Sequence, residues 1–228
     1  MTTVRMVPTH EIVRRAYPRP EPGERERIAM AIGKALDAAL AQFGHELRQG
    51  RRPTQAAIAR EAHAALDEGL AEAAAEIPAG EHASVERSIQ EFLRAYRQCE
   101  LAGLARPRTR VLLIAGEVGV YAQPDFWDGR RRFFEMKSYR AIPPPPDVAL
   151  QVRFFQLAFP GFEATLFCLD RHTSPVQASS LVLPPPTAAE TRDALRLAFE
   201  VGRELGQDKV LEYVEGPFVR YDLDGTPS

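Results

Sequence analysis

The stretch PDFWDGRRRFFEMKS, residues 124–138, carries three side chains whose types and spacing could perform chemistry. Glu135 and Lys137 are two residues apart in an apolar run typical of a strand, so we expect both on the same face. Asp125 precedes an Asp-Gly dipeptide that favours a tight hairpin. A two-residue loop would turn Asp125 away from Glu135, whereas a loop of three or five residues would bring the two carboxylates to one face.

Two carboxylates and a lysine on one face indicate metal-assisted chemistry at a phosphate. Carboxylates about 4 Å apart repel by on the order of 4 kcal/mol at an effective dielectric near 20. Lys137 supplies one compensating charge, and a divalent cation such as Mg²⁺ or Mn²⁺, held by Asp125 and Glu135, would supply the rest. A water beside such a cation and a lysine can attack phosphorus. The alternative is a plain surface ion pair, since the pattern is short and a second Pro-Asp dipeptide occurs at 146–147.

The Pro-Asp dipeptide at 124–125 and the EMK tripeptide at 135–137 resemble the motif of the PD-(D/E)XK nuclease superfamily. The resemblance covers about residues 109–183. It includes Gln151 with Phe155 four residues later, which is similar to the RecB-like branch, where tyrosine is the commoner aromatic. The implied fold is a restriction-endonuclease-like αβββαβ core with a mixed sheet.

The resemblance also implies roles for individual residues. Asp125 and Glu135 would be metal ligands, Lys137 would orient or activate the attacking water, and Gln151 would hold the lysine or the substrate strand. The residue types alone allow Gln151 simply to satisfy a buried backbone group. RecB-like members often carry a histidine in an early helix, where this chain has Asp37. Relatives with an iron-sulfur cluster use four cysteines, and this chain has 2, so no cluster is expected.

Two further acidic residues are candidates for an additional ligand. Glu100 follows the apolar stripe of the third predicted helix, and related nucleases often add an acid from such a helix. The alternative, which we favour, is that Glu100 is a solvent-exposed residue at the end of the helix without a role in the site. Glu117 lies between two glycines in the first predicted strand region, without a geometric argument for a role.

Helical and strand patterns predict the elements that must position these residues. Helical periodicity predicts three helices, over 24–47, from 54 to about 78, and from 84 onward. The β-branched and aliphatic stretch after Pro107 predicts strands before the hairpin. After the hairpin we expect a nearly all-apolar helix capped by Asp147, then two strands, and then a final helix with a Thr187–Glu190 capping box.

This order predicts an α/β fold with a mixed sheet and an N-terminal helical lobe. We expect a flexible segment at 1–23, the helical lobe at 24–106, a nuclease core at 107–220 and a loose tail at 221–228. Because the passage from 133 to 169 runs strand, helix, strand, a right-handed crossover between parallel strands is predicted.

Composition limits the classes of partner and compartment. A net charge of -2 and a pI near 6.2 argue against a protein that coats nucleic acid through bulk charge. A local basic series could still contact DNA, and it comprises Arg130, Arg131, Arg132, Lys137, Arg140 and Arg153. The 2 cysteines form no CxxC pattern, the 5 histidines show no metal-ligand spacing, and no apolar run suits a membrane span. We therefore expect a cytoplasmic protein.

The leading hypothesis is a Mg²⁺- or Mn²⁺-dependent nuclease that hydrolyses phosphodiester bonds in DNA, of the RecB-like exonuclease type. The alternative is a catalytically inactive module of the same fold that binds nucleic acid, or that binds a protein partner through its helical lobe. The sequence does not distinguish DNA from RNA as the substrate, or an endonuclease from an exonuclease. It also leaves the biological pathway and the oligomeric state open.

Overall fold

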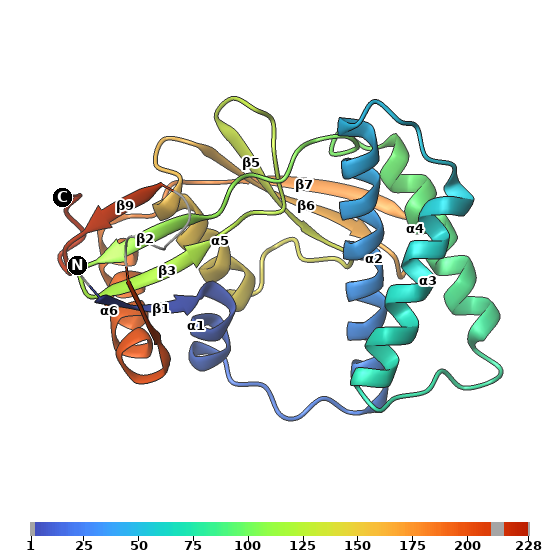
Figure 1. Cartoon of the computed structure of the whole chain (residues 1–228), viewed down its shortest axis with the longest axis horizontal. Helices are drawn as coiled ribbons and strands as arrows, with labels where there is room; N and C mark the ends of the chain where they lie inside the picture. The colour runs from blue at the N-terminus through green and yellow to red at the C-terminus, as the bar shows by residue number, and fades with distance from the viewer. Residues whose placement is uncertain (1–2, 211–216, 228) are drawn as a thin grey trace.

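The computed structural model describes residues 3–210 and 217–227 and shows a mixed α/β fold. Within these residues the chain forms six helices and nine strands, and the strands make two mixed sheets. The sheets follow one another across the molecule, with helices α2, α3 and α4 grouped at one end (Figure 1). The α/β class expected from the sequence is confirmed, whereas one mixed sheet was expected and two are found.

Five strands form the first sheet, in the order β8-β1-β3-β2-β9. They are β1 (Thr3–Pro8), β2 (Arg110–Ile114), β3 (Val118–Ala122), β8 (Gln207–Val210) and β9 (Phe218–Tyr221). Strand β1 runs parallel to β3, and β3 pairs antiparallel with β2. The β2–β3 connection places Ala115 and Gly116 at positive φ, a conformation that glycine adopts at little cost.

The N-terminal segment was expected to be flexible, but most of its described residues form a strand and a helix. Strand β1 lies inside the first sheet, and helix α1 (Thr9–Ala16) follows it directly. Val4, Met6 and Ile12 are at most 3% exposed, so this segment contributes to the core. Its apolar pattern is too short to predict a strand, because the partners that stabilise it lie far along the chain. Among the described residues of the segment, 3–23, only 17–23 lie outside a helix or strand.

Four strands form the second sheet, in the order β4-β5-β6-β7. They are β4 (Phe126–Trp127), β5 (Arg132–Lys137), β6 (Glu163–Asp170) and β7 (Gln177–Leu183). Strands β5 and β6 are parallel and are joined through helix α5 (Pro146–Ala158), as the strand-helix-strand order predicted. Pro124 separates β3 from β4, because a proline has no N–H with which to continue the ladder of the first sheet.

The helical lobe consists of α2 (Glu24–Arg48), α3 (Gln55–Glu72) and α4 (His82–Gln98). Its apolar core is continuous with side chains of the second sheet, including Phe134 and Met136 of β5. The start of α3 matches its predicted N-cap, since the Thr54 hydroxyl accepts a hydrogen bond from the Ala57 N–H at 3.2 Å. The lobe therefore covers one face of the second sheet.

Helix α5 contacts the opposite face of strand β5. The rings of Phe133 and Phe155 meet edge to face, with centroids 6.3 Å apart. Phe133 faces α5 while Phe134 faces the helical lobe, because successive strand residues point to opposite faces. Both faces of β5 are thus covered, which explains its apolar sequence around Glu135.

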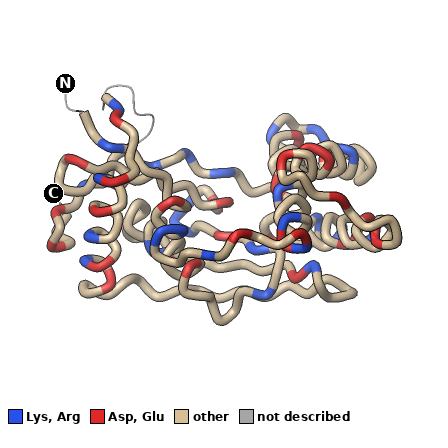
Figure 2. The backbone as a smooth tube through the Cα atoms, turned by 90° about the horizontal axis from the view of Figure 1, so that it is seen from below, with Lys and Arg blue, Asp and Glu red and all other residues tan. Residues whose placement is uncertain are grey.

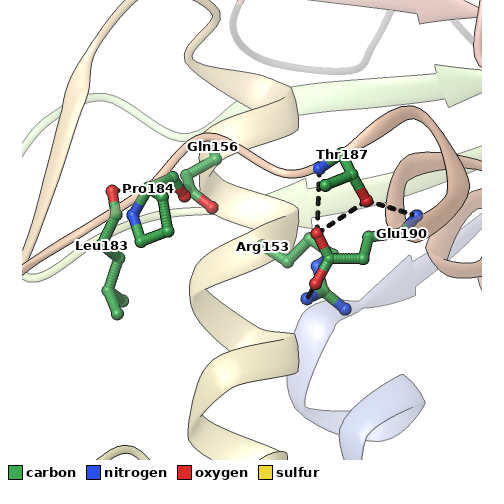
Figure 3. Close-up of polar contacts among 6 residues, drawn as sticks. All are labelled: Arg153, Gln156, Leu183, Pro184, Thr187 and Glu190. Carbon is green, nitrogen blue, oxygen red and sulfur yellow. Dashed lines mark hydrogen bonds and ion pairs between the residues drawn. The ribbon is translucent and has the colours of Figure 1, made fainter.

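Polar contacts attach α5 to the segment that leads into α6 (Ala188–Leu205). Arg153 of α5 pairs with Glu190, which also closes the predicted capping box with Thr187 (Figure 3). One turn along, Gln156 Nε2 donates to the Pro184 carbonyl oxygen at 2.8 Å. The capping box is confirmed, and these contacts fix the orientation of the helix that carries Gln151.

Two smaller expectations differ from the structure. Asp147 was expected to cap α5, but Pro145 holds the N-cap position and Asp147 lies in the first turn, because proline at the start fits the helix without needing its N–H. The tail at 221–228 was expected to be loose. In its described part Tyr221 is buried and the Asp222 side chain accepts two backbone hydrogen bonds from the turn that follows it.

Candidate active site

The hairpin register brings Asp125 to the face of Glu135. Phe126 pairs with Phe134, Trp127 pairs with Phe133, and the Asp128 N–H donates to the Arg132 carbonyl oxygen at 3.1 Å, so residues 129–131 form the loop. In this register the next position places Asp125 opposite Glu135. Gly129 adopts a φ of +75° within the loop. The odd-length loop is therefore the alternative that the structure adopts.

Hydrogen bonds and the hairpin register bring the four predicted site residues together. Asp125 Oδ2 accepts from the Met136 N–H at 2.9 Å, which holds its carboxylate against β5. Lys137 Nζ donates to Glu135 Oε1 at 2.7 Å and to Gln151 Oε1 of α5 at 3.1 Å. The four residues are thus adjacent, although Asp125 lies just before β4, Glu135 and Lys137 lie in β5, and Gln151 lies in α5.

Burial makes the charges at this site strongly interdependent. The side chain of Glu135 is 4% exposed and that of Lys137 is 17% exposed. Burial, and then the Asp125 charge, hold the pKa of Glu135 well above its usual range, although Lys137 opposes this shift. Burial by itself would lower the pKa of Lys137, but the Glu135 and Asp125 carboxylates outweigh it and raise that pKa. The site thus favours added positive charge.

One oxygen of Glu135 has the properties of a metal-ligand atom. Glu135 Oε2 is buried and has no hydrogen-bond partner among the described residues. A buried carboxylate oxygen without a partner is costly, and a divalent cation would satisfy it. Mg²⁺ commonly binds through one or two carboxylates with waters and phosphate oxygens, so Asp125 and Glu135 fit such an ion. Within the described residues, no three acidic, histidine or cysteine side chains are grouped to hold a metal.

Asp37 of α2 lies close enough to the acidic pair to interact with it electrostatically. Surrounding protein reduces its solvation, and this effect together with the Asp125 charge raises the pKa of Asp37 to about 6. Arg106 and Lys137 oppose that shift. The side chain is nevertheless solvent-exposed, so Asp37 borders the site from the helical lobe rather than lying within it. Arg106 was not recognised in the sequence, because it precedes two further arginines, Arg108 and Arg110, and no local pattern distinguishes it from them.

The other acidic candidates lie apart from this group. Glu100 is exposed just beyond α4, and its nearest cationic contact is Arg132 at 4.0 Å, which agrees with the solvated alternative. Glu117 is exposed in the β2–β3 turn of the first sheet, where its carbonyl oxygen accepts from Arg5. Phe155 packs on Phe133 and contributes to the core.

The basic series around the hairpin divides into paired and exposed members. Arg153 pairs with Glu190, and Arg132 lies 3.8 Å from Asp128 and stacks over the Phe134 ring at 4.6 Å, so both already have protein partners. Arg130 and Arg131 are exposed at the hairpin tip, and Arg140 is exposed beyond β5. Basic and acidic residues are interspersed along both the sheets and the helical lobe (Figure 2). Any phosphate contact must therefore be local.

None of the described helices combines the length and the apolar character needed to cross a lipid bilayer. Comparisons with protein-family models, with curated proteins and with solved structures found no match for the chain.

Proposed function

We propose that the protein is a metal-dependent nuclease that hydrolyses phosphodiester bonds in DNA and is similar to RecB-like members of the PD-(D/E)XK superfamily. The observation that carries this proposal is the meeting of Asp125, Glu135 and Lys137 on one face of the hairpin. A surface ion pair would not need a carboxylate oxygen buried without a partner, as Glu135 Oε2 is.

The side chains take distinct roles in this proposal. Asp125 and Glu135 would hold Mg²⁺ or Mn²⁺, which would neutralise charge on the scissile phosphate when bound. Lys137, fixed between Glu135 and Gln151, presents an ammonium group in a defined direction. It would orient the attacking water or donate to a phosphate oxygen. Gln151 is then a positioning residue that acts through Lys137.

The surroundings of the site suit a single phosphodiester rather than a long electrostatic track. Arg106 and Asp37 border the acidic pair, and Arg140 lies just beyond Lys137. The proposed setting is the cytoplasm, where the free Cys99 and Cys168 would stay reduced.

Cleavage assays with Lys137→Ala test the proposal. Supercoiled, linear duplex and single-stranded DNA are incubated with Mg²⁺ or Mn²⁺, with an RNA of the same sequence in parallel. Lys209→Ala is the matched control, because Lys209 is exposed on β8 in the first sheet. Loss of cleavage in Lys137→Ala alone, with an unchanged circular dichroism spectrum, supports the mechanism. Equal cleavage by both variants would refute it.

A catalytically inactive binding module is the second candidate, and one observation favours it. Asp125 Oδ2 and Glu135 Oε1 already have protein partners, so the fold is compatible with a metal-free site. Melting curves with increasing Mg²⁺ or Mn²⁺ separate the two candidates, because an ion that binds only the folded state raises the melting temperature. An unchanged melting temperature at concentrations well above millimolar would favour the module.

A further inference from the structure

Arg106 lies in a segment that runs along the outer edge of the hairpin, next to the candidate active site. The Trp127 N–H of β4 donates to the Ala105 carbonyl oxygen at 3.0 Å, in an isolated antiparallel bridge. Continuing this register places Arg106 beside Phe126 and the following residue beside Asp125. The bridge therefore brings the backbone of Arg106 to within one position of Asp125 on the neighbouring segment.

Contacts on both sides hold the backbone of Arg106 in place. The bridge at Ala105 fixes the residue before it. On the other side, Gln123 Nε2 donates to the Pro107 carbonyl oxygen at 3.1 Å, and Pro107 is buried. The proline ring also restricts the backbone at its own position and disfavours a helical conformation at Arg106. A side chain presented from a fixed backbone loses less entropy when it binds a ligand.

The guanidinium group of Arg106 is accessible to a ligand. The residue is exposed, and no carboxylate among the described residues forms an ion pair with it. Two other arginines near the hairpin, Arg132 and Arg153, have acidic partners. Arg106 thus differs from them in presenting a cation that no described carboxylate contacts directly.

Asp37 and Tyr96 indicate that the Arg106 charge lies on the helical-lobe side of the acidic pair. Burial and then the Asp125 charge raise the pKa of Asp37, and the Arg106 charge opposes that rise. Burial also raises the pKa of the Tyr96 hydroxyl, and here too the Arg106 and Asp125 charges act in opposite directions. Charge interactions weaken with distance, so Arg106 and Asp125 lie near the same two groups. Lys137 lies on the other side, where it contacts helix α5. One cation thus lies on each side of the acidic pair.

This arrangement suits a strand that carries a negative charge at every linkage, as nucleic acid does. In the proposed function, the metal ion and Lys137 neutralise the phosphate that is cleaved. Where the strand passes the helical lobe, its next phosphate approaches the exposed Asp37 carboxylate and needs a cation of its own. A guanidinium group can donate two parallel hydrogen bonds to a phosphate. Arg106 lies on the side where this second contact is required.

We infer that Arg106 binds the phosphate adjacent to the scissile one, so that the substrate is a strand with at least two consecutive phosphates. The inference rests on the proposed function, because that proposal defines the scissile position. It goes beyond that function by separating a nucleic-acid strand from a small phosphodiester as the substrate. It extends the site by a single phosphate and requires no long basic track.

Steady-state cleavage of DNA in Mn²⁺ at several salt concentrations tests the inference, with the DNA form that the wild type cleaves. We expect Arg106→Gln to raise KM about tenfold, because a charged hydrogen bond to phosphate is lost. The effect on kcat should be smaller, since a neighbouring phosphate is held equally in the ground state and the transition state. The slope of log KM against log salt concentration should fall by about 0.7 for a single strand or about 0.9 for a duplex. Arg106→Lys keeps the charge but not the paired donors, so it should keep the slope and raise KM less.

Arg60→Gln is the matched control, because Arg60 is exposed on α3, which lies farther from the two sheets than α2 does (Figure 1). It should keep the wild-type KM and salt slope, and circular dichroism checks the fold of each variant. The inference alone is overturned if the wild type cleaves DNA and Arg106→Gln keeps the wild-type KM and slope, or if Arg106→Gln lowers kcat without changing KM. Absence of wild-type cleavage of every DNA form would refute the proposed function and, with it, this inference.

Discussion

Replacing Lys137 by methionine removes the buried ammonium group at the candidate site while keeping a side chain of similar length. The structure places Lys137 Nζ at 2.7 Å from Glu135 Oε1, with both side chains largely buried. Removing one partner of a buried ion pair typically costs about 3–5 kcal/mol, because the other charge is left without compensation. Glu135 can avoid part of this cost by taking up a proton, which removes its charge.

The cost of Lys137→Met is therefore expected to depend on pH. The pKa of Glu135 is already raised in the folded protein, and loss of Lys137, which lowers it, would raise it further. A carboxyl group with a raised folded pKa loses stability as pH rises from its unfolded value through its folded value. The variant thus loses more stability than the wild type over this window. We expect a loss of about 3–5 kcal/mol near pH 8. Near pH 5 we expect about 1–2 kcal/mol, mainly the lost hydrogen bond to Gln151.

Urea denaturation in EDTA at both pH values measures this difference, with Lys209→Met as the exposed control. The same preparations enter the DNA cleavage assay, so stability and activity are compared on one variant. A loss of stability that is equal at the two pH values would show that Lys137 is not coupled to the protonation of Glu135, and the electrostatic description of the site would then be incorrect.

Three further outcomes are expected. Gly129→Ala should destabilise the protein by about 1 kcal/mol because of the φ of +75°, measured by urea denaturation; Gly80→Ala, with no positive φ, is the control and should not. Thr54→Ala should cost about 1 kcal/mol through loss of the α3 cap, and an unchanged denaturation midpoint would contradict that role. Asp37→Asn should flatten the pH dependence of the melting temperature in EDTA. The pKa of Asp37 is raised to about 6 in the folded protein, so this group destabilises the wild type as pH rises from about 4 to 6. Superimposable profiles of the two proteins would argue against an interaction of Asp37 with Asp125.

Local features of the chain were predictable to the extent that they follow from backbone geometry. Strand alternation placed Glu135 and Lys137 on one face, and the ion pair between them agrees with that prediction. Helical periodicity located the helices of the lobe, and the Thr187–Glu190 capping box marked the start of α6. These patterns need only a few neighbouring residues, so the sequence carries them completely.

The sequence by itself thus determined which residues could form a site and which faces they would occupy. Only the tertiary structure decided that Asp125 joins Glu135, because the register depends on the length of the hairpin loop, and the Asp-Gly dipeptide is compatible with more than one length. Contacts between distant segments likewise brought Gln151 to Lys137, placed Asp37 beside the acidic pair and paired β1 with β3. Packing of whole elements determines these contacts, and no local pattern in the chain contains that information.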